Sequence, residues 1–269
     1  MSMTNVFPIE LSLIRELVID ACREELLPRF QHTAFSYKQD GSLVTEADLN
    51  VQTRLQQALF DLHPEIPLLG EEMSEQYQKA IIGDGNTPFW CLDPLDGTSN
   101  FASGIPFFST SLALIENGQP KLGIIYDPIR DECFIAEKDK GASLNDKPLD
   151  TSNTAHTALQ QCSAIIDFKR LSSELATRLA IKAPYSSQRS FGSVALDWCW
   201  LAAGRGQVYL HGKQKLWDYA AGWLILDEAG GYSSSLQGDR DFHAVLEPRS
   251  AVAAASKNLY EDWFHWISG

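Results

Sequence analysis

The pattern of strand-like and helix-like segments changes once along the chain, near residue 150. Between residues 107 and 149, strand-type runs such as FFSTSLALIENGQPKLGIIYDP alternate with turn signals, and no helix is needed. From about residue 160, strand-like runs such as CSAIIDF alternate with helical ones such as LWDYAAGWLILDEAGG. We therefore predict an α/β protein with an α+β half at 1–150 and an α/β half at 151–269, joined at the polar stretch DTSNTAHTA.

Two helices are expected in the first half. Residues 7 to 30 place apolar side chains at helical spacing until Pro28 ends the run. A second helix fits residues 45 to 62, where Thr45 can cap the start and the dipeptide HP stops it. The stretch SYKQDGSLV between them predicts two short strands around a turn at residues 40 and 41.

Two apolar runs, IPLLGEE and PFWCLDP, predict buried strands that end in carboxylates. Pro94 cannot donate to a sheet, so we expect the second strand to end near Asp93. Gly97 permits a tight turn into a helix, which would leave the N–H groups of Gly97 and Thr98 free to bind an anion.

Acidic residues recur at such element ends. The set comprises Asp48, Glu71, Glu72, Asp93, Asp96 and Asp218. Carboxylates repel a phosphate unless a divalent cation lies between them, and oxygen ligands without His or Cys favour Mg²⁺ over zinc. Each acid taken singly also fits a solvated or capping role, and the DPLDG stretch alone also fits an ordinary turn.

Two other acidic motifs are excluded for the DPLDG stretch. A calcium-binding EF-hand loop needs an acid where Leu95 lies and another where Gly104 lies. A haloacid dehalogenase-type nucleophile needs an acid two residues before Asp96, where the chain has Pro94.

The charge balance limits the partners. The 269-residue chain is 44% hydrophobic and carries a formal net charge of -13, which repels nucleic acid and anionic membranes. Five cysteines without a C-x-x-C pair argue against a disulfide framework or a zinc site. The N-terminus lacks the pattern of a signal peptide and no stretch is long enough to span a bilayer, so we expect a cytoplasmic protein.

Taken together, the motifs resemble those of the inositol monophosphatase family. WCLDPLDGTSNF and LWDYAAGWLILDEAGG match its two signatures, with VTEAD and GEE upstream and GSVAL between them. The resemblance runs from the first helix to the C-terminus. It implies a layered α-β-α-β-α sandwich of the inositol monophosphatase and fructose-1,6-bisphosphatase type, and a homodimer.

The resemblance also implies roles for individual residues. Two to three Mg²⁺ ions would be held by Glu71, Asp93, Asp96, Asp218 and the carbonyl of Leu95. Thr98, with Glu71 and Asp48, would activate the attacking water. The substrate would be bound by Gly97, Thr98, Asp96 and Asp218.

One position departs from the family pattern. Seven residues before Asp218, where inositol-preferring members carry Glu, the chain has His211, followed by Lys213 and Lys215. These three residues fit either a solvent-facing loop or a basic pocket for a second anionic group.

The predicted function is Mg²⁺-dependent hydrolysis of a small phosphate monoester, such as an inositol 1-phosphate-like polyol or sugar phosphate. The alternatives are a 3'(2'),5'-bisphosphate nucleotidase, a fructose-1,6-bisphosphatase, or a catalytically silent regulatory protein with this fold.

Overall fold

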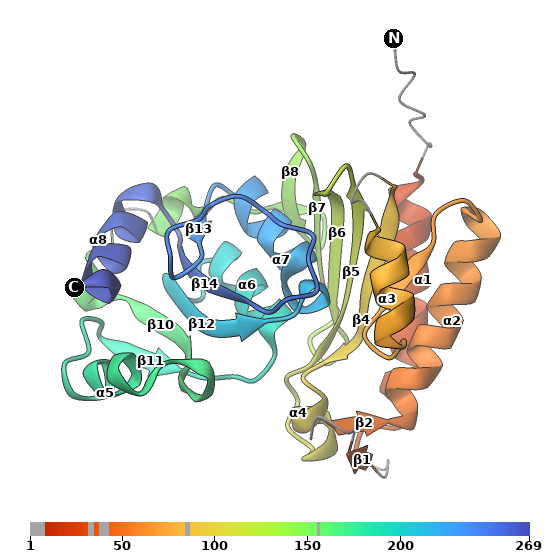
Figure 1. The fold of residues 1–269 in the computed structure, drawn as a ribbon, viewed down its shortest axis with the longest axis horizontal. Coiled ribbons are helices and arrows are strands. Elements are labelled where there is room, and N and C mark those ends of the chain that lie inside the picture. The colour runs from red at the N-terminus through yellow and green to blue at the C-terminus, as the bar shows by residue number, and fades with distance from the viewer. Residues whose placement is uncertain (1–8, 32–34, 38–42, 84–86, 155–156) are drawn as a thin grey trace.

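In a computed structural model the chain forms five alternating layers of helix and sheet (Figure 1). The structure describes residues 9–31, 35–37, 43–83, 87–154 and 157–269. From the N-terminal side the layers are a helix pair, a seven-stranded sheet, a second helix pair, a five-stranded sheet and outer helices. The predicted α/β fold class with its α-β-α-β-α order is confirmed.

The outer helix pair consists of α1 (Leu11–Ala21), extended by a π-helical turn over Cys22–Leu26, and α2 (Glu46–Leu62). Both helices were predicted. Thr45 caps α2 as expected, because its side chain accepts a hydrogen bond from the N–H of Ala47. Strands β1 (Phe35–Tyr37) and β2 (Leu43–Thr45) pair antiparallel before α2, whereas the turn predicted at residues 40 and 41 lies outside the described residues.

The seven-stranded sheet has the strand order β3-β4-β5-β6-β7-β8-β9. Its strands are β3 (Leu68–Gly70), β4 (Phe89–Asp96), β5 (Ser109–Glu116), β6 (Gln119–Asp127), β7 (Glu132–Glu137), β8 (Gly141–Leu144) and β9 (Lys147–Pro148). Only the β3–β4 pair is parallel, with α3 (Glu75–Ile82) between the two strands in sequence. The antiparallel run without helices predicted for 107–149 is confirmed.

Strand β4 does not end near Asp93, as Pro94 led us to expect, but continues to Asp96. The register shows why. Asp93 lies opposite Ser111 and Asp96 opposite Ser109, so β4 has one more residue than β5 between these two paired positions. This β-bulge tolerates a proline that has no N–H to donate, and it turns the end of the strand toward the site.

The five-stranded sheet has the order β11-β10-β12-β14-β13. Its strands are β10 (Ser163–Asp167), β11 (Ser187–Arg189), β12 (Val208–Gln214), β13 (Tyr232–Ser234) and β14 (Arg249–Ala254). They alternate with α5 (Ser173–Ile181), α6 (Val194–Ala202), α7 (Leu216–Glu228) and α8 (Lys257–Ser268), as predicted except for the short β13. Among the described residues, no helix combines the length and apolar character needed to cross a bilayer.

Helices α6 and α7 fill the space between the two sheets. Both are buried around most of their circumference, because one side of the pair packs on each sheet. Separate cores lie between α1, α2 and the outer face of the seven-stranded sheet, and between α8 and the outer face of the five-stranded sheet. The division into halves at residue 150 stays a prediction. Helices α6 and α7 come from the second half of the sequence, but they pack against the sheets of both halves.

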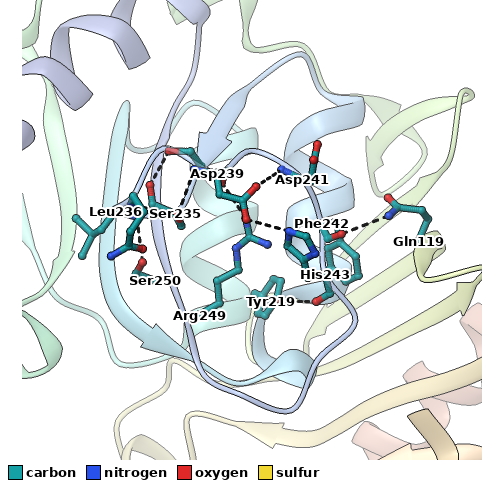
Figure 2. Close-up of polar contacts among 12 residues, drawn as sticks. Gln119, Tyr219, Ser235, Leu236, Asp239, Asp241, Phe242, His243, Arg249 and Ser250 are labelled. Carbon is teal, nitrogen blue, oxygen red and sulfur yellow. Dashed lines mark hydrogen bonds and ion pairs between the residues drawn. The ribbon is translucent and has the colours of Figure 1, made fainter. Parts of the chain in front are cut away.

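The segment between β13 and β14 passes over the middle layer and makes polar contacts with α7, β6 and β14 (Figure 2). Asp239 accepts a hydrogen bond from Nε2 of His243 at 2.9 Å and pairs with Arg249 at 3.2 Å. The Tyr219 hydroxyl of α7 donates to the carbonyl of His243 at 2.9 Å, and Gln119 of the seven-stranded sheet donates to the carbonyl of Phe242 at 3.3 Å. The segment thus ties both sheets to the middle layer.

Candidate active site

Asp96, at the end of β4, is held by the N-terminus of α6. Its carboxylate accepts hydrogen bonds from the N–H groups of Val194 at 3.1 Å and Ala195 at 2.8 Å, and from the hydroxyl of Ser193. These donors favour the charged form, but burial outweighs them, and Glu71 adds repulsion. The pKa of Asp96 rises to about 6 as a result.

Asp93, three residues earlier on the same strand, is only 2% exposed. Its Oδ1 accepts the N–H of Leu95 at 3.0 Å, which fixes the carboxylate inside the bulge. Burial raises the pKa of Asp93 well above its ordinary value, and so do the nearby charges of Glu71, Asp96, Asp218 and Asp48. Five acids predicted from four separate motifs therefore lie within electrostatic reach of one another.

Thr98 opens the short helix α4 (Thr98–Ala102) and connects two of the predicted groups. Its hydroxyl lies 2.9 Å from the carbonyl oxygen of Leu95 and 3.2 Å from Oδ1 of Asp48. The other oxygen of Asp48 accepts the N–H and hydroxyl of Thr45 at the start of α2. Burial raises the pKa of Asp48 to about 6 despite these hydrogen bonds.

Asp218 and Glu71 come from two further element ends. Asp218 lies in the first turn of α7 and accepts the N–H of Lys215 at 2.8 Å. Burial, followed by the charges of Asp96 and Glu71, raises the pKa of Asp218 well above its ordinary value. Glu71 directly follows β3, where its N–H donates to the carbonyl of Leu92 on β4.

The donor chemistry of this acidic group fits a hard divalent cation. Burial and repulsion between the acids raise the pKa values of Asp93 and Asp218, and a cation between the carboxylates would favour their charged forms. Within the described ranges no three acidic, histidine or cysteine side chains are arranged to hold a metal ion by themselves. Mg²⁺ does not require such a cage, because it usually keeps several waters and takes only one or two carboxylates.

Gly97, between β4 and α4, requires the absence of a side chain. Its φ of +93° lies in the left-handed region, and a Cβ would come within 3.1 Å of the carbonyl oxygen of Phe107 and 3.3 Å of that of Gly192. The backbone can therefore turn sharply from the strand into α4. The predicted phosphate contacts of the Gly97 and Thr98 N–H groups stay a prediction.

His211 is buried within β12 and has partners for both ring nitrogens. Nε2 lies 3.0 Å from Oδ2 of Asp167, and Nδ1 accepts the N–H of Lys213 at 3.2 Å. Nδ1 is thus unprotonated and Nε2 donates to Asp167. The side chains of Lys213 and Lys215 are exposed on either side of Gln214.

Two residues of this region had no predicted role. Ser193 lies in the quoted GSVAL motif, and its position at a helix start was a signal for the capping of a neighbouring group. Asp167 ends β10 opposite His211, but the sequence separates the pair by more than forty residues and offers no signal for it.

The family model described as "Inositol monophosphatase family" matches residues 6–265. A protein described as Nus factor SuhB from Pasteurella multocida (strain Pm70) is 34% identical over 227 residues, covering 83% of this chain and 82% of that protein. Inositol-1-monophosphatase from Mesorhizobium japonicum is 33% identical over 226 residues, with the same coverage. The chain belongs to the inositol monophosphatase family, and it is a phosphatase enzyme.

Solved structures agree with the fold. The extragenic suppressor protein suhB from Bartonella henselae superposes with a TM-score of 0.80 at 29% identity, covering 95% of this chain and 97% of that one. A protein described as IMPase/NADP phosphatase complexed with Mg²⁺ and phosphate has a TM-score of 0.80 over 94% of each chain. At 24% identity it speaks for the fold alone.

Proposed function

We propose that the protein hydrolyses a small phosphate monoester with Mg²⁺ as cofactor. The observation that carries this proposal is the convergence of Asp48, Glu71, Asp93, Asp96 and Asp218, whose like charges act on one another in the protein interior. A structural role does not need such repulsion, whereas a cation and phosphate site does. Two to three ions, a homodimer and a cytoplasmic location belong to the same proposal on the family resemblance.

Different residues of the site would hold the metal, orient the water and bind the phosphate. Asp93, Asp96, Asp218, Glu71 and the carbonyl of Leu95 would hold the metal. When bound, Mg²⁺ supplies the charge that neutralises these acids and the phosphate, and makes water a better nucleophile.

The Thr98 hydroxyl lies between Asp48 and the Leu95 carbonyl, which suits it to orient the attacking water, with Asp48 accepting the hydroxyl proton at Oδ1. The N–H groups of Gly97 and Thr98 would hold the phosphate.

The test compares Asp93→Asn with wild type in phosphate release from inositol 1-phosphate. We expect kcat to fall by at least ~10²-fold, because an electrostatic group at the reacting phosphate is lost. Exposed Asp61, which bonds Gln57 on α2, provides a matched control, and Asp61→Asn should keep wild-type activity. Wild-type turnover in chelator, or full turnover by Asp93→Asn, would refute the metal assignment.

A regulatory role is the second candidate, because a relative at 34% identity is described as a Nus factor. A protein kept only for binding has no need of an intact acidic group. If no small phosphate ester yields phosphate with Mg²⁺ present, the binding role becomes the better description. The nucleotidase and fructose-1,6-bisphosphatase alternatives are distinguished by the same panel of esters.

A further inference from the structure

The end of β10 is paired with β12, the strand that leads to α7 and Asp218. In the pairing of β10 with β12, Asp167 is opposite His211. Strand β10 ends at Asp167, whereas β12 continues to Gln214, and α7 with Asp218 begins shortly after β12. The turn that follows β10, Phe168–Arg170, packs against β12 and so lies beside the strand that leads to Asp218.

A glycine brings this turn onto β12. A Cβ at Gly212 would lie 1.7 Å from the carbonyl oxygen of Arg170, which no side chain can tolerate. The absence of a side chain at Gly212 thus allows the backbone of Arg170 to rest directly on the strand that leads to Asp218. The position of Arg170 is fixed by backbone packing and does not depend on a flexible surface loop.

The Arg170 side chain is oriented by Asp167 and still has part of its surface exposed to solvent. Its Nε lies 3.6 Å from Oδ2 of Asp167, and half of the side chain is exposed. Asp167 also accepts the N–H of Lys169 at 2.8 Å and Nε2 of His211 at 3.0 Å, so its charge is shared among three donors. Because half of the side chain is exposed, the guanidinium can still bind an anion bidentately.

Arg170 is also close to the proposed metal ligands. Its charge lowers the pKa of Asp218, against the larger upward effects of burial, Asp96 and Glu71. This guanidinium lies within electrostatic reach of Asp218 in a chain of net charge -13. It offsets the repulsion that such a chain exerts on an anionic leaving group.

His211, Lys213 and Lys215, which the sequence suggested for a basic pocket, are less suited than Arg170 to bind an anionic group. His211 has both ring nitrogens engaged within the chain, by Asp167 and by the N–H of Lys213. The side chains of Lys213 and Lys215 are exposed, and Lys215 lies over the ring of Trp217 at 5.9 Å.

We propose that Arg170 determines specificity by binding a second anionic group on the leaving part of the substrate. The substrate class is a phosphate monoester of a small alcohol that carries a further phosphate, phosphonate or carboxylate. This inference rests on the proposed phosphatase function and narrows it.

The test uses two esters that differ in the second anion, 3-phosphonopropyl phosphate and butyl phosphate. Only the ester bond of each can be hydrolysed, so phosphate release reports one reaction. We expect wild type to prefer the phosphonate ester in kcat/KM by about 10-fold, the lower range for a charged hydrogen bond at a half-exposed site. Arg170→Gln should bring the ratio near one, and Arg170→Lys should restore part of it.

Lys169 provides the matched control, because it is an exposed cation on the same turn and forms no ion pair with Asp167 in the described structure. Lys169→Gln should keep the wild-type ratio. Three outcomes overturn the inference while phosphate release still supports the phosphatase: no preference in wild type, an unchanged ratio in Arg170→Gln, or an equal loss in Lys169→Gln.

A binding measurement tests the role of Arg170 independently of the proposed phosphatase activity. Propane-1,3-diphosphonate cannot be hydrolysed, and its dissociation constant is measured by calorimetry with Mg²⁺ present. Arg170→Gln should weaken binding about 10-fold even if no ester is turned over. Equal dissociation constants for wild type and Arg170→Gln would refute the role of Arg170 whatever the enzyme assays give.

Discussion

Each sheet brings an aspartate to the region of the candidate site, Asp93 within β4 and Asp167 at the end of β10, and the two aspartates differ in their surroundings. On the seven-stranded sheet, burial and neighbouring acids raise the pKa of Asp93 well above its ordinary value. On the five-stranded sheet, burial also acts upward on Asp167, but the hydrogen bonds from His211 and Lys169 and the charge of Arg170 lower its pKa overall. Among the described residues, the leading charges that act on Asp93 are those of other acids, whereas Asp167 has Arg170 as a positive partner.

The difference assigns separate tasks to the two sides. On the side of Asp93, negative charge dominates among the described residues, as expected where a cation and the reacting phosphate bind. The other side is balanced by residues of the chain, and it can offer a guanidinium to the rest of the substrate. Three predictions test this contrast, in order of decreasing expected effect.

The first prediction concerns stability without metal. A folded-state pKa raised from 3.8 to about 6 means that the unfolded chain ionises first as pH rises, so stability is full below about pH 4 and is lost up to about pH 6. For Asp96 the loss is on the order of 3 kcal/mol. Mg²⁺ should restore stability above pH 6, because it binds the folded form.

Urea unfolding at pH 4.5 and pH 7 in chelator measures this effect. Asp96→Asn should reduce the pH dependence and leave the part due to Asp48, whereas the exposed control Asp61→Asn should keep all of it. A chain that is equally stable at both pH values would mean that the acidic side is not electrostatically unbalanced.

The second prediction concerns Thr98→Ala. We expect kcat to fall about 10²-fold with little change in KM, because the hydroxyl between Asp48 and the Leu95 carbonyl acts on the water and not on the phosphate. Steady-state kinetics with inositol 1-phosphate separates the two parameters. A raised KM with kcat intact would make Thr98 a binding residue.

The third prediction concerns Gly212→Ala, which affects only the five-stranded side. The added Cβ would force the backbone of Arg170 away from β12, at a cost of about 2 kcal/mol in stability. The anion preference should fall, while the hydrolysis of butyl phosphate should change less. Lys213→Ala next to it should change the stability by less than about 0.5 kcal/mol. Retained stability of Gly212→Ala would show that the turn can move freely.

The sequence predicted the parts of the site that lie in short motifs. Asp93, Asp96 and Thr98 occur within six residues, so turn chemistry alone indicated a shared location. The bulge at Pro94 was not predictable, because it depends on the register with β5. Arg170 and Asp167 were missed for a similar reason, since their relation to His211 arises from the pairing of β10 with β12 and from a backbone contact at Gly212.

The middle layer has a consequence for synthesis of the chain. One face of the seven-stranded sheet is covered by α6 and α7, and α7 ends at Glu228. All seven strands of that sheet are complete by Pro148. About eighty residues must therefore be translated while an apolar sheet face has no cover, which takes some 4 to 16 seconds at ~5–20 residues per second. During that interval the nascent protein is most exposed to aggregation and most in need of a chaperone.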